Sequence, residues 1–277
     1  MTKRQALMAE GGVSSVRLNG VAMAYDDIGE SSDVIVLVHG HPFNRSMWAP
    51  QVVALAAAGW RTIVPDLRGY GDTEVAPGTT TLDVFARDIA ALLDNLGVGR
   101  TVLGGLSMGG QIVMEFARLF PERLRGIVLA ATSPQSETEA GKQRRREMAA
   151  RLRAEGMDSY SVEALPKMLA PRSISAAPET AARVMAMMRA THPEGAAAAL
   201  LGRAERPPYE PVLERLGVPA LIVVGDEDAF TTRGDADLMH QLLTDSELVW
   251  MEGVGHLPNL ERPEAFNAAL LSWLATV

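Results

Sequence analysis

The chain has 277 residues, of which 47% are hydrophobic and 22% charged, with a formal net charge of −8 and no cysteine. This length and balance predict a globular protein with a large buried core. The negative charge argues against nucleic acid or an anionic membrane surface as a partner. The lack of cysteine excludes a disulfide framework, a cysteine nucleophile and thiolate metal ligands.

The ends and the most apolar segments of the chain give no sign of export or of membrane insertion. Residues 1–10 include basic side chains but no sustained apolar run, so we expect no signal peptide. The most apolar run, 34–38, is far too short to cross a bilayer. These features predict a cytoplasmic protein with no membrane partner.

The first half of the chain alternates between extended and helical patterns. Extended patterns at 15–18 and 21–25 flank Asn19-Gly20, which is a strong signal for a β-hairpin. We then expect, in chain order, a strand at 34–38, a helix at 47–58, a strand at 62–65, a helix at 81–96 with Thr80 as N-cap, a strand at 100–104, a helix at 111–119 and a strand at 126–130. Strands that are apolar throughout predict a mostly parallel sheet covered by helices on both faces.

The pattern changes after Pro134 and later returns. Between 135 and 206 there is no strand candidate, only helical segments broken by glycine and proline. The alternation resumes with a strand at 221–224, a helix at 235–243, a strand at 248–251 and a final helix from 263. We therefore predict a core in two parts, 1–134 and 207–277, with a helical cap at 135–206 inserted after the sixth strand. Such a cap would cover the sheet edge at which open α/β folds bind ligands.

The basic run 144–146 stands out within this predicted cap. Because acidic residues surround it in the sequence, we interpret it as the solvated face of a helix.

Residues 105–109 form a Gly-Leu-Ser-Met-Gly sequence between a predicted strand and a predicted helix. This order is typical of a nucleophile elbow, in which a serine occupies a very tight turn. Gly105 and Gly109 fit because a Cβ at either position would collide with the neighbouring strand or helix. We predict that Ser107 is a nucleophile, with the helix N-terminus favouring negative charge beside it.

A serine nucleophile needs a base within reach and a third group that orients the base. His256 lies between the last strand and the last helix, in a loop where such a sheet gathers its site residues, and is the predicted base. Three carboxylates follow the seventh strand, and we choose Asp228 because it lies furthest into the loop. Asp226 and Glu227 are then expected to form the turn or to be solvated.

The oxyanion of a tetrahedral intermediate needs hydrogen-bond donors. The backbone N–H of Met108, at the start of the elbow helix, is one predicted donor. The other should come from the loop after strand 34–38, where Pro42 has no N–H and Gly40 and His41 remain. We favour His41 because it projects further from the strand end. Its imidazole either lines the pocket or is solvated.

Six of the 14 methionines lie in the predicted cap. They could pack the small helices together or form an adaptable apolar ceiling over a substrate, and both readings stay open. As substrate contacts we predict Gly40 and Phe43 near the first strand end and Met185 and Met188 in the cap. No metal-ligand cluster and no phosphate-binding loop occurs in the sequence, so no metal and no cofactor is expected.

Five motifs, in order, are similar to those of the α/β-hydrolase superfamily. They are H-G-x-P at 39–42, D-x-R-G-x-G at 66–71, the elbow at 105–110, G-x-x-D at 225–228, and the histidine loop with its helix at 255–264. The resemblance covers nearly the whole chain and implies an eight-stranded α/β-hydrolase fold with the order Ser107, Asp228, His256. It also implies that Asp66 and Arg68 are structural. Within the superfamily, the elbow and the cap length resemble those of bacterial carboxylesterases and 3-oxoadipate enol-lactonase.

These features predict a serine hydrolase that cleaves carboxylic esters or lactones through an acyl-enzyme on Ser107. Haloalkane dehalogenases and epoxide hydrolases need an aspartate at the elbow, so Ser107 argues against both. Three alternatives stay open: a carbon–carbon bond hydrolase of diketones, a cofactor-free haloperoxidase or perhydrolase, and a ligand receptor of the same fold. The expected partner is a small ester or lactone, and a homodimer is among the oligomeric states that the sequence leaves open.

Overall fold

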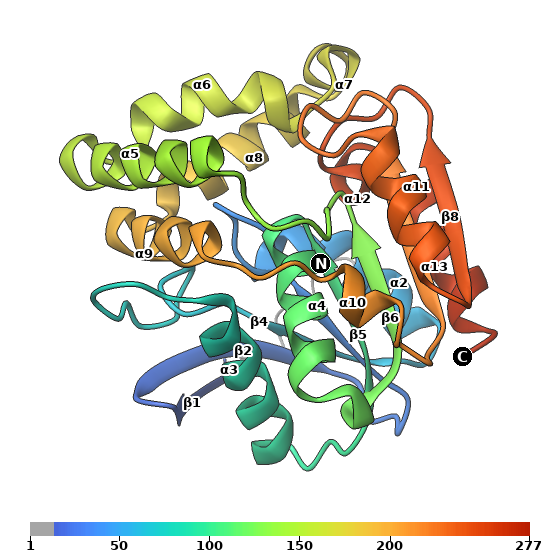
Figure 1. Cartoon of the computed structure of the whole chain (residues 1–277). Helices are drawn as coiled ribbons and strands as arrows, with labels where there is room; N and C mark the ends of the chain where they lie inside the picture. The colour runs from blue at the N-terminus through green and yellow to red at the C-terminus, as the bar shows by residue number, and fades with distance from the viewer. Residues whose placement is uncertain (1–13) are drawn as a thin grey trace, which may run out of the picture.

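An eight-stranded sheet lies at the centre of the computed structural model, which describes residues 14–277 (Figure 1). Its strands are β1 (Ser14–Leu18), β2 (Val21–Ile28), β3 (Val34–Val38), β4 (Arg61–Pro65), β5 (Thr101–Leu106), β6 (Leu124–Ala130), β7 (Ala220–Gly225) and β8 (Ser246–Met251). They lie in the order β1-β2-β4-β3-β5-β6-β7-β8. β2 runs antiparallel to β1 and β4, and all the other neighbouring strands are parallel. The predicted mostly parallel sheet is confirmed. The prediction that there is no signal peptide concerns residues 1–10, which lie outside the described residues.

The hairpin at the start of the sheet forms where the sequence predicts it. Leu18 pairs with Val21, so the turn consists of Asn19 and Gly20 alone. Both turn residues have positive φ, 45° and 84°, as a two-residue turn matched to the strand twist requires. Asparagine and glycine are the residues that adopt this conformation most readily.

Helices cover both faces of the sheet, which confirms the predicted layers. The core helices are α2 (Ala49–Ala57), α3 (Leu82–Asn95), α4 (Met108–Leu119), α10 (Glu210–Leu213), α11 (Arg233–Leu242), α12 (Pro258–Glu261) and α13 (Pro263–Leu274), with 3₁₀ turns η1 (Arg45–Trp48) and η2 (Pro121–Arg123). Alternate residues of β3 face opposite sides, because Val36 packs with α3 and α4 while Leu37 packs with α2 and α13. Each face of the sheet therefore has its own hydrophobic core.

Five helices stand between β6 and β7, in the segment for which the sequence predicts only helices. They are α5 (Glu139–Glu155), α6 (Asp158–Met168), α7 (Pro171–Ala176), α8 (Pro178–Ala190) and α9 (Pro193–Ala204). In Figure 1 they lie on one side of the molecule, the side toward which the arrowheads of β6 and β8 point. We call these five helices the cap; the domain boundaries proposed from the sequence stay a prediction.

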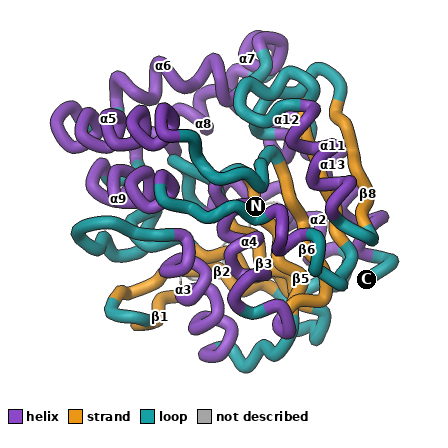
Figure 2. Tube along the Cα trace, in the orientation of Figure 1, coloured by secondary structure: helices purple, strands orange, loops and turns teal. Residues whose placement is uncertain are grey.

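The two chain segments that join the cap to the sheet run beside each other between the two layers (Figure 2). The amide of Tyr209 donates to the carbonyl oxygen of Pro134 at 2.8 Å, and Nε of Arg206 donates to the carbonyl oxygen of Gln135 at 2.9 Å. Hydrogen bonds thus join the segment that leads into the cap to the segment that leads out of it.

The starts of α2 and α3 differ from the prediction. The predicted helix at 47–58 is divided into η1 and α2, with Pro50 in the first turn of α2, where its missing N–H leaves no hydrogen bond unmade. Thr80 as N-cap was wrong, because Thr81 is the N-cap of α3. The amide of Thr80 instead donates to the carbonyl oxygen of Ala198 in α9, at 3.1 Å. Thr80 therefore makes a tertiary contact with the cap and does not cap the helix that follows it.

Helix α9 touches the core through glycine. A Cβ at Gly202 would collide with the backbone carbonyl of Thr80, and one at Gly195 would collide with the backbone of Gly69. Backbone atoms cannot move aside as a flexible side chain can. These two contacts therefore set how closely the cap approaches the core.

Replacing Gly202 with alanine is expected to lower the free energy of unfolding by about 1–3 kcal/mol, because the new methyl group overpacks a backbone contact. Alanine favours a helix over glycine by up to about 1 kcal/mol, so any loss reports the collision. Thermal unfolding followed by circular dichroism measures the effect. Gly217→Ala is the control, because its Cβ would meet nothing within 4 Å; equal stability of the two variants would contradict the contact.

Candidate active site

Ser107 lies at a strained turn between β5 and α4. Its φ and ψ are 57° and −114°, a conformation that residues with a Cβ rarely adopt. A Cβ at Gly105 would collide with the backbone of Gly109, and a Cβ at Gly109 would collide with the carbonyl of Val38. The predicted steric reason for both glycines is confirmed. The turn is possible only because positions 105 and 109, two residues before and after the serine, have no Cβ.

The loops after β7 and β8 bring Asp228 and His256 together. Nδ1 of His256 lies 2.9 Å from each carboxylate oxygen of Asp228, and both side chains are buried. A carboxylate can only accept, so the proton of the ring must be on Nδ1 and the ring's other nitrogen is left as an acceptor. This is the arrangement in which a histidine can take a proton from a hydroxyl group.

Asp228 stays ionised at this buried position. Burial alone would raise the pKa of its carboxyl, but the charge and hydrogen bond of His256 and the backbone N–H groups of Phe230 and Thr231 outweigh burial and lower the pKa. The amide of Phe230 donates to Oδ1 at 2.8 Å. The carboxylate is therefore fixed by its own loop as well as by the histidine.

The two acidic residues before Asp228 form no hydrogen bond with His256. Asp226 accepts hydrogen bonds from the amides of Gly253, at 2.6 Å, and Val254, at 3.3 Å, and so ties the loop after β7 to the loop after β8. Glu227 is exposed. These positions match the turn-forming and solvated roles expected from the sequence.

Ser107 and His256 line one cavity of about 270 Å³ beneath the cap, which we call the inner cavity. The two residues are far apart in the chain, and Asp228 lies behind the histidine ring. The sheet thus brings the three predicted residues to one place at the carboxyl ends of its strands.

Two backbone N–H groups near Ser107 have no acceptor in the part of the chain that the structure describes. One belongs to Met108, the first residue of α4, and the other to His41, in the loop after β3. The absence of a side chain at Gly40 lets this loop lie close to the elbow, since a Cβ there would lie 3.4 Å from the Cβ of Ser107 and 2.9 Å from the oxygen of Leu106. Their role as oxyanion donors stays a prediction.

The ring of His41 is not solvated. It is 5% exposed and lines the inner cavity, with Nδ1 2.8 Å from the hydroxyl oxygen of Tyr70. Burial, followed by the charges of Arg203 and Arg145, lowers the pKa of His41 well below its ordinary value, so the ring is neutral. Its Nε2 is buried without a hydrogen-bond partner among residues 14–277.

Asp66 and Arg68 make structural contacts. Asp66 accepts from the amides of Arg45, at 2.7 Å, and Asp72, at 2.8 Å, and Arg68 pairs with buried Asp88 at 2.8 Å. Neither residue lines the inner cavity. The geometry supports the structural role that the family resemblance implies.

None of the four predicted substrate contacts is among the residues that line the inner cavity, and Gly40 instead packs against the elbow. Phe43 and Met188 are fully buried in the hydrophobic cluster that also contains residues of α2 and α13, and Met185 packs against the same cluster. Of the cap methionines, Met168 lines the inner cavity and Met148 lines a neighbouring chamber. Both readings of the methionines therefore hold, but for different residues than expected.

Polar cap residues form much of the cavity wall, and the sequence did not reveal them. Arg145 lines the inner cavity, so the interpretation of 144–146 as a solvated face was wrong for this residue. Arg146, one residue later, does lie at the surface and pairs with Glu205 at 2.8 Å. Tyr160 and Arg203 also line the inner cavity without having been predicted. Only the folding of the cap decides which cationic side chains turn inward.

One carboxylate serves two of these cations. Glu137 accepts from Arg145 and from Nη1 of Arg206, the latter at 3.2 Å. Burial would raise the pKa of Glu137, but the charges and hydrogen bonds of the two arginines outweigh it and lower the pKa. Glu137 therefore links the cap helix α5 to the segment that leaves the cap.

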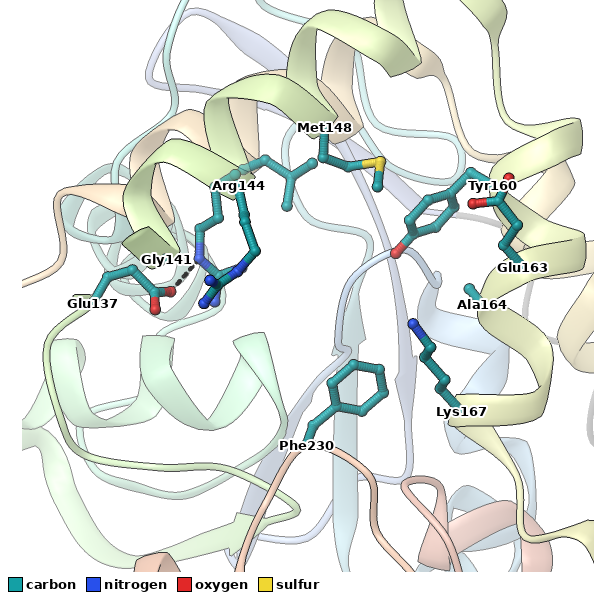
Figure 3. A pocket seen from close by; sticks show the side chains of 11 residues that line it. Glu137, Gly141, Arg144, Met148, Tyr160, Glu163, Ala164, Lys167 and Phe230 are labelled. Carbon is teal, nitrogen blue, oxygen red and sulfur yellow. Dashed lines mark hydrogen bonds and ion pairs between the residues drawn. The ribbon is translucent and has the colours of Figure 1, made fainter. Parts of the chain in front are cut away.

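A second chamber of about 320 Å³ adjoins the inner cavity (Figure 3). The two share part of their walls, including Tyr160 and Phe230. The ring of Phe230 is 49% exposed and lies 4.7 Å from the ring of His256. In Figure 3, Tyr160, Lys167 and Phe230 approach one another across this outer chamber.

No helix within residues 14–277 is both long and apolar enough to cross a membrane. In the same residues, no three metal-ligating side chains gather in a group that could hold a metal ion.

The fold and the site agree with a comparison against known families. Residues 35–269 match the model of the alpha/beta hydrolase family. The chain belongs to this family. The elbow at Ser107 and the loops that carry Asp228 and His256 all lie within the matched residues.

The proteins to which the chain is similar are named for different reactions. The chain is 28% identical over 251 residues to 3-oxoadipate enol-lactonase 2 of Acinetobacter baylyi, covering 90% of this chain and 92% of that protein. It is 31% identical over 268 residues to a 2-hydroxy-6-oxononadienedioate/2-hydroxy-6-oxononatrienedioate hydrolase of Burkholderia vietnamiensis, covering 90% of each. Among solved structures, a thermophilic esterase from Thermogutta terrifontis superposes with a TM-score of 0.90 at 36% identity, over 95% of this chain and 97% of the other.

Replacing Glu137 with glutamine is expected to lower the melting temperature at neutral pH, because Arg145 and Arg206 lose their shared carboxylate. The pKa of Glu137 is lowered in the folded state, so its stabilising effect is complete above the ordinary value of about 4.5 and is lost as pH falls through the lower, folded value. The difference in melting temperature between the wild type and the variant should therefore shrink toward acid pH.

Calorimetry at a series of pH values between about 3 and 7 measures this difference. Glu214→Gln, which removes an exposed carboxylate, is the control and should change the melting temperature little at any pH. A Glu137→Gln deficit that stays constant through the acid range would contradict the ion-pair assignment.

Proposed function

We propose that this protein is a serine hydrolase that cleaves carboxylic esters or lactones, with Ser107, Asp228 and His256 as its catalytic triad. The observation that carries the proposal is the buried pair of His256 and Asp228 in the wall of the cavity that Ser107 also lines. The esterase and enol-lactonase relatives support the choice of substrate class. The cytoplasmic location predicted from the sequence remains a prediction.

The protonation of His256, held by Asp228, determines the first steps of the proposed reaction. Asp228 keeps the ring proton of His256 on Nδ1, which leaves Nε2 to take the proton of the Ser107 hydroxyl as its oxygen attacks the ester carbonyl. The oxyanion that forms accepts hydrogen bonds from the N–H groups of His41 and Met108. His256 then gives its proton to the departing alcohol, and the acyl group stays on Ser107.

Water completes the cycle. His256 removes a proton from a water molecule, which attacks the acyl-enzyme, and the proton returns to Ser107 as the carboxylic acid leaves. Apart from substrate and water, these steps use only side chains and backbone groups of this chain.

A carbon–carbon bond hydrolase is the second candidate, because a relative at 31% identity is named as a hydrolase of 2-hydroxy-6-oxononadienedioate. The same triad would serve that reaction. Parallel rates on short-chain esters, lactones and ring-cleavage diketones separate the two candidates, and a preference for the diketones would replace our proposal with this one.

Replacing Ser107 with alanine is expected to lower kcat for p-nitrophenyl acetate by at least about 10³-fold, because the acyl group loses its acceptor. Steady-state release of p-nitrophenol measures it. Ser246→Ala, at the surface beside His240, is the control and should leave the rate unchanged. Steady turnover that survives in Ser107→Ala would overturn the assignment, and a single slow burst in the wild type would favour a receptor.

Replacing Asp228 with asparagine is expected to lower kcat by about 10⁴-fold while the protein stays folded, since the amide favours the wrong tautomer of His256. Ester hydrolysis and circular dichroism are measured together. Glu227→Gln, which changes an exposed neighbour on the same loop, is the matched control. If both variants retain wild-type rates, Asp228 is not the orienting acid.

A further inference from the structure

The wall of the inner cavity carries an excess of positive charge, although the whole chain has a formal net charge of −8. Its ionised lining residues are Arg145, Arg203, Arg206 and Glu137, and the ring of His41 is neutral. Three cations face one anion, which leaves two positive charges without a counter-charge in the wall.

Arg203 is the cation that lacks a carboxylate. It is 8% exposed, and Glu137 is already engaged by Arg145 and Arg206. Within residues 14–277, the one hydrogen-bond partner of the Arg203 side chain is the side-chain oxygen of Gln111, which accepts from Nε at 3.1 Å. The two terminal nitrogens of the guanidinium therefore have no protein acceptor, in a residue that lines the cavity.

A buried guanidinium without a counter-ion is unfavourable in the empty protein. Burial is the largest cause that lowers the pKa of Arg203, and the charges of Arg145 and Arg206 lower it further. A hydrophobic side chain of similar volume would fill the same space without this penalty. A negatively charged ligand in the cavity would remove this penalty, because it would supply the missing counter-ion.

A second unpartnered polar group lies in the same wall. Nε2 of His41 is buried and has no partner in the described part of the chain. Burial raises the pKa of the Tyr70 phenol, so the phenol keeps its proton and can donate it to Nδ1 of His41. In that arrangement the ring proton is on Nε2, as a buried donor without an acceptor.

The geometry points to a substrate that itself carries an ionised carboxyl group, held in the inner cavity by the guanidinium of Arg203. We propose that the protein acts on esters or lactones of this kind in preference to neutral ones. The planar fork of a guanidinium matches the two oxygens of a carboxylate. This inference rests on the proposed hydrolytic function of the same site.

Charge balance during the reaction fits the same substrate class. When Ser107 attacks, its proton passes to His256, so the new oxyanion is matched by an imidazolium and the net charge of the site does not change. The surplus positive charges of the wall are therefore left for a negative charge that the substrate itself carries.

The outer chamber extends the positive surface toward the exterior. Arg144 and Lys167 line it, and Figure 3 shows the amine of Lys167 between Tyr160 and Phe230. Glu163 also lines it, but its two oxygens accept from Arg151, at 2.8 and 2.6 Å. An anionic substrate would therefore be drawn inward along this route.

The first test compares wild-type kcat/KM on ester pairs in which one methyl group is replaced by a carboxylate. On the acyl side the pairs are ethyl butanoate with monoethyl succinate, ethyl pentanoate with monoethyl glutarate, and ethyl hexanoate with monoethyl adipate. On the alcohol side the pair is butyl acetate with 4-acetoxybutanoate. We expect the charged member of at least one pair to be favoured by about 10-fold or more, as a charged hydrogen bond would provide.

The second test replaces Arg203. In Arg203→Met the ratio of charged to neutral kcat/KM should fall by about 10- to 100-fold, and Arg203→Lys should restore part of it, since it keeps the charge without the fork. Arg146→Gln removes the same charge from the surface of the cap and should leave the ratio unchanged. A ratio that falls equally in Arg146→Gln would show only a general effect of net charge and would overturn the subsite.

The outcomes separate the two proposals. If the wild type turns over none of these esters, and Ser107→Ala makes no difference, the proposed function fails. If the wild type hydrolyses neutral esters through Ser107 but favours no charged member, the function stands and the carboxylate subsite is overturned. A charged preference that persists in folded Arg203→Met also overturns it, and if that variant does not fold, the wild-type ratio and Arg203→Lys decide.

Discussion

The contact between Asp228 and His256 is the constraint on which the rest of the site depends. A 2.9 Å approach of two buried side chains requires the loops after β7 and β8 to be fixed relative to one another. Asp226 fixes them by accepting from the amides of the second loop, and Gly225 allows the approach because a Cβ there would collide with Val254. A loop that would otherwise be mobile is thus held by backbone hydrogen bonds, and the imidazole is oriented before any substrate binds.

The fold and the centre of the site could be predicted because their signals are local. A hairpin turn, continuously apolar strands and an elbow glycine pair each report the backbone within a few residues. The loops that carry Asp228 and His256 follow directly from the strand positions, because parallel strands end at one edge of the sheet. The predicted helix at 81–96 did form, but its N-cap is Thr81 and not Thr80. The amide of Thr80 instead bonds to α9, over 100 residues away, and no local pattern reports such a contact.

The lining of the cavity could not be predicted in the same way. Phe43 and Met188 were predicted to contact a substrate, but as hydrophobic side chains they are buried in the cluster that also contains residues of α2 and α13. Conversely, a basic run between acidic residues gives no sign that Arg145 turns inward while Arg146 faces solvent. Which face of a cap helix meets the cavity is decided by how α5 packs on α9, and no local pattern encodes that.

The backbone contacts of the cap and the charge of its wall are parts of one arrangement. Arg203 follows directly after Gly202, the residue whose missing side chain lets α9 rest on the backbone of Thr80. From there its Nε reaches Gln111 on the elbow helix, so one residue of the cap contacts the helix that begins beside Ser107. Glu137 ties the entry of the cap to its exit through Arg145 and Arg206, and this leaves Arg203 as the cation without a carboxylate. The close packing of α9 therefore fixes an uncompensated charge in the wall of the cavity that Ser107 also lines, as recognition of a charged substrate by a rigid site would require.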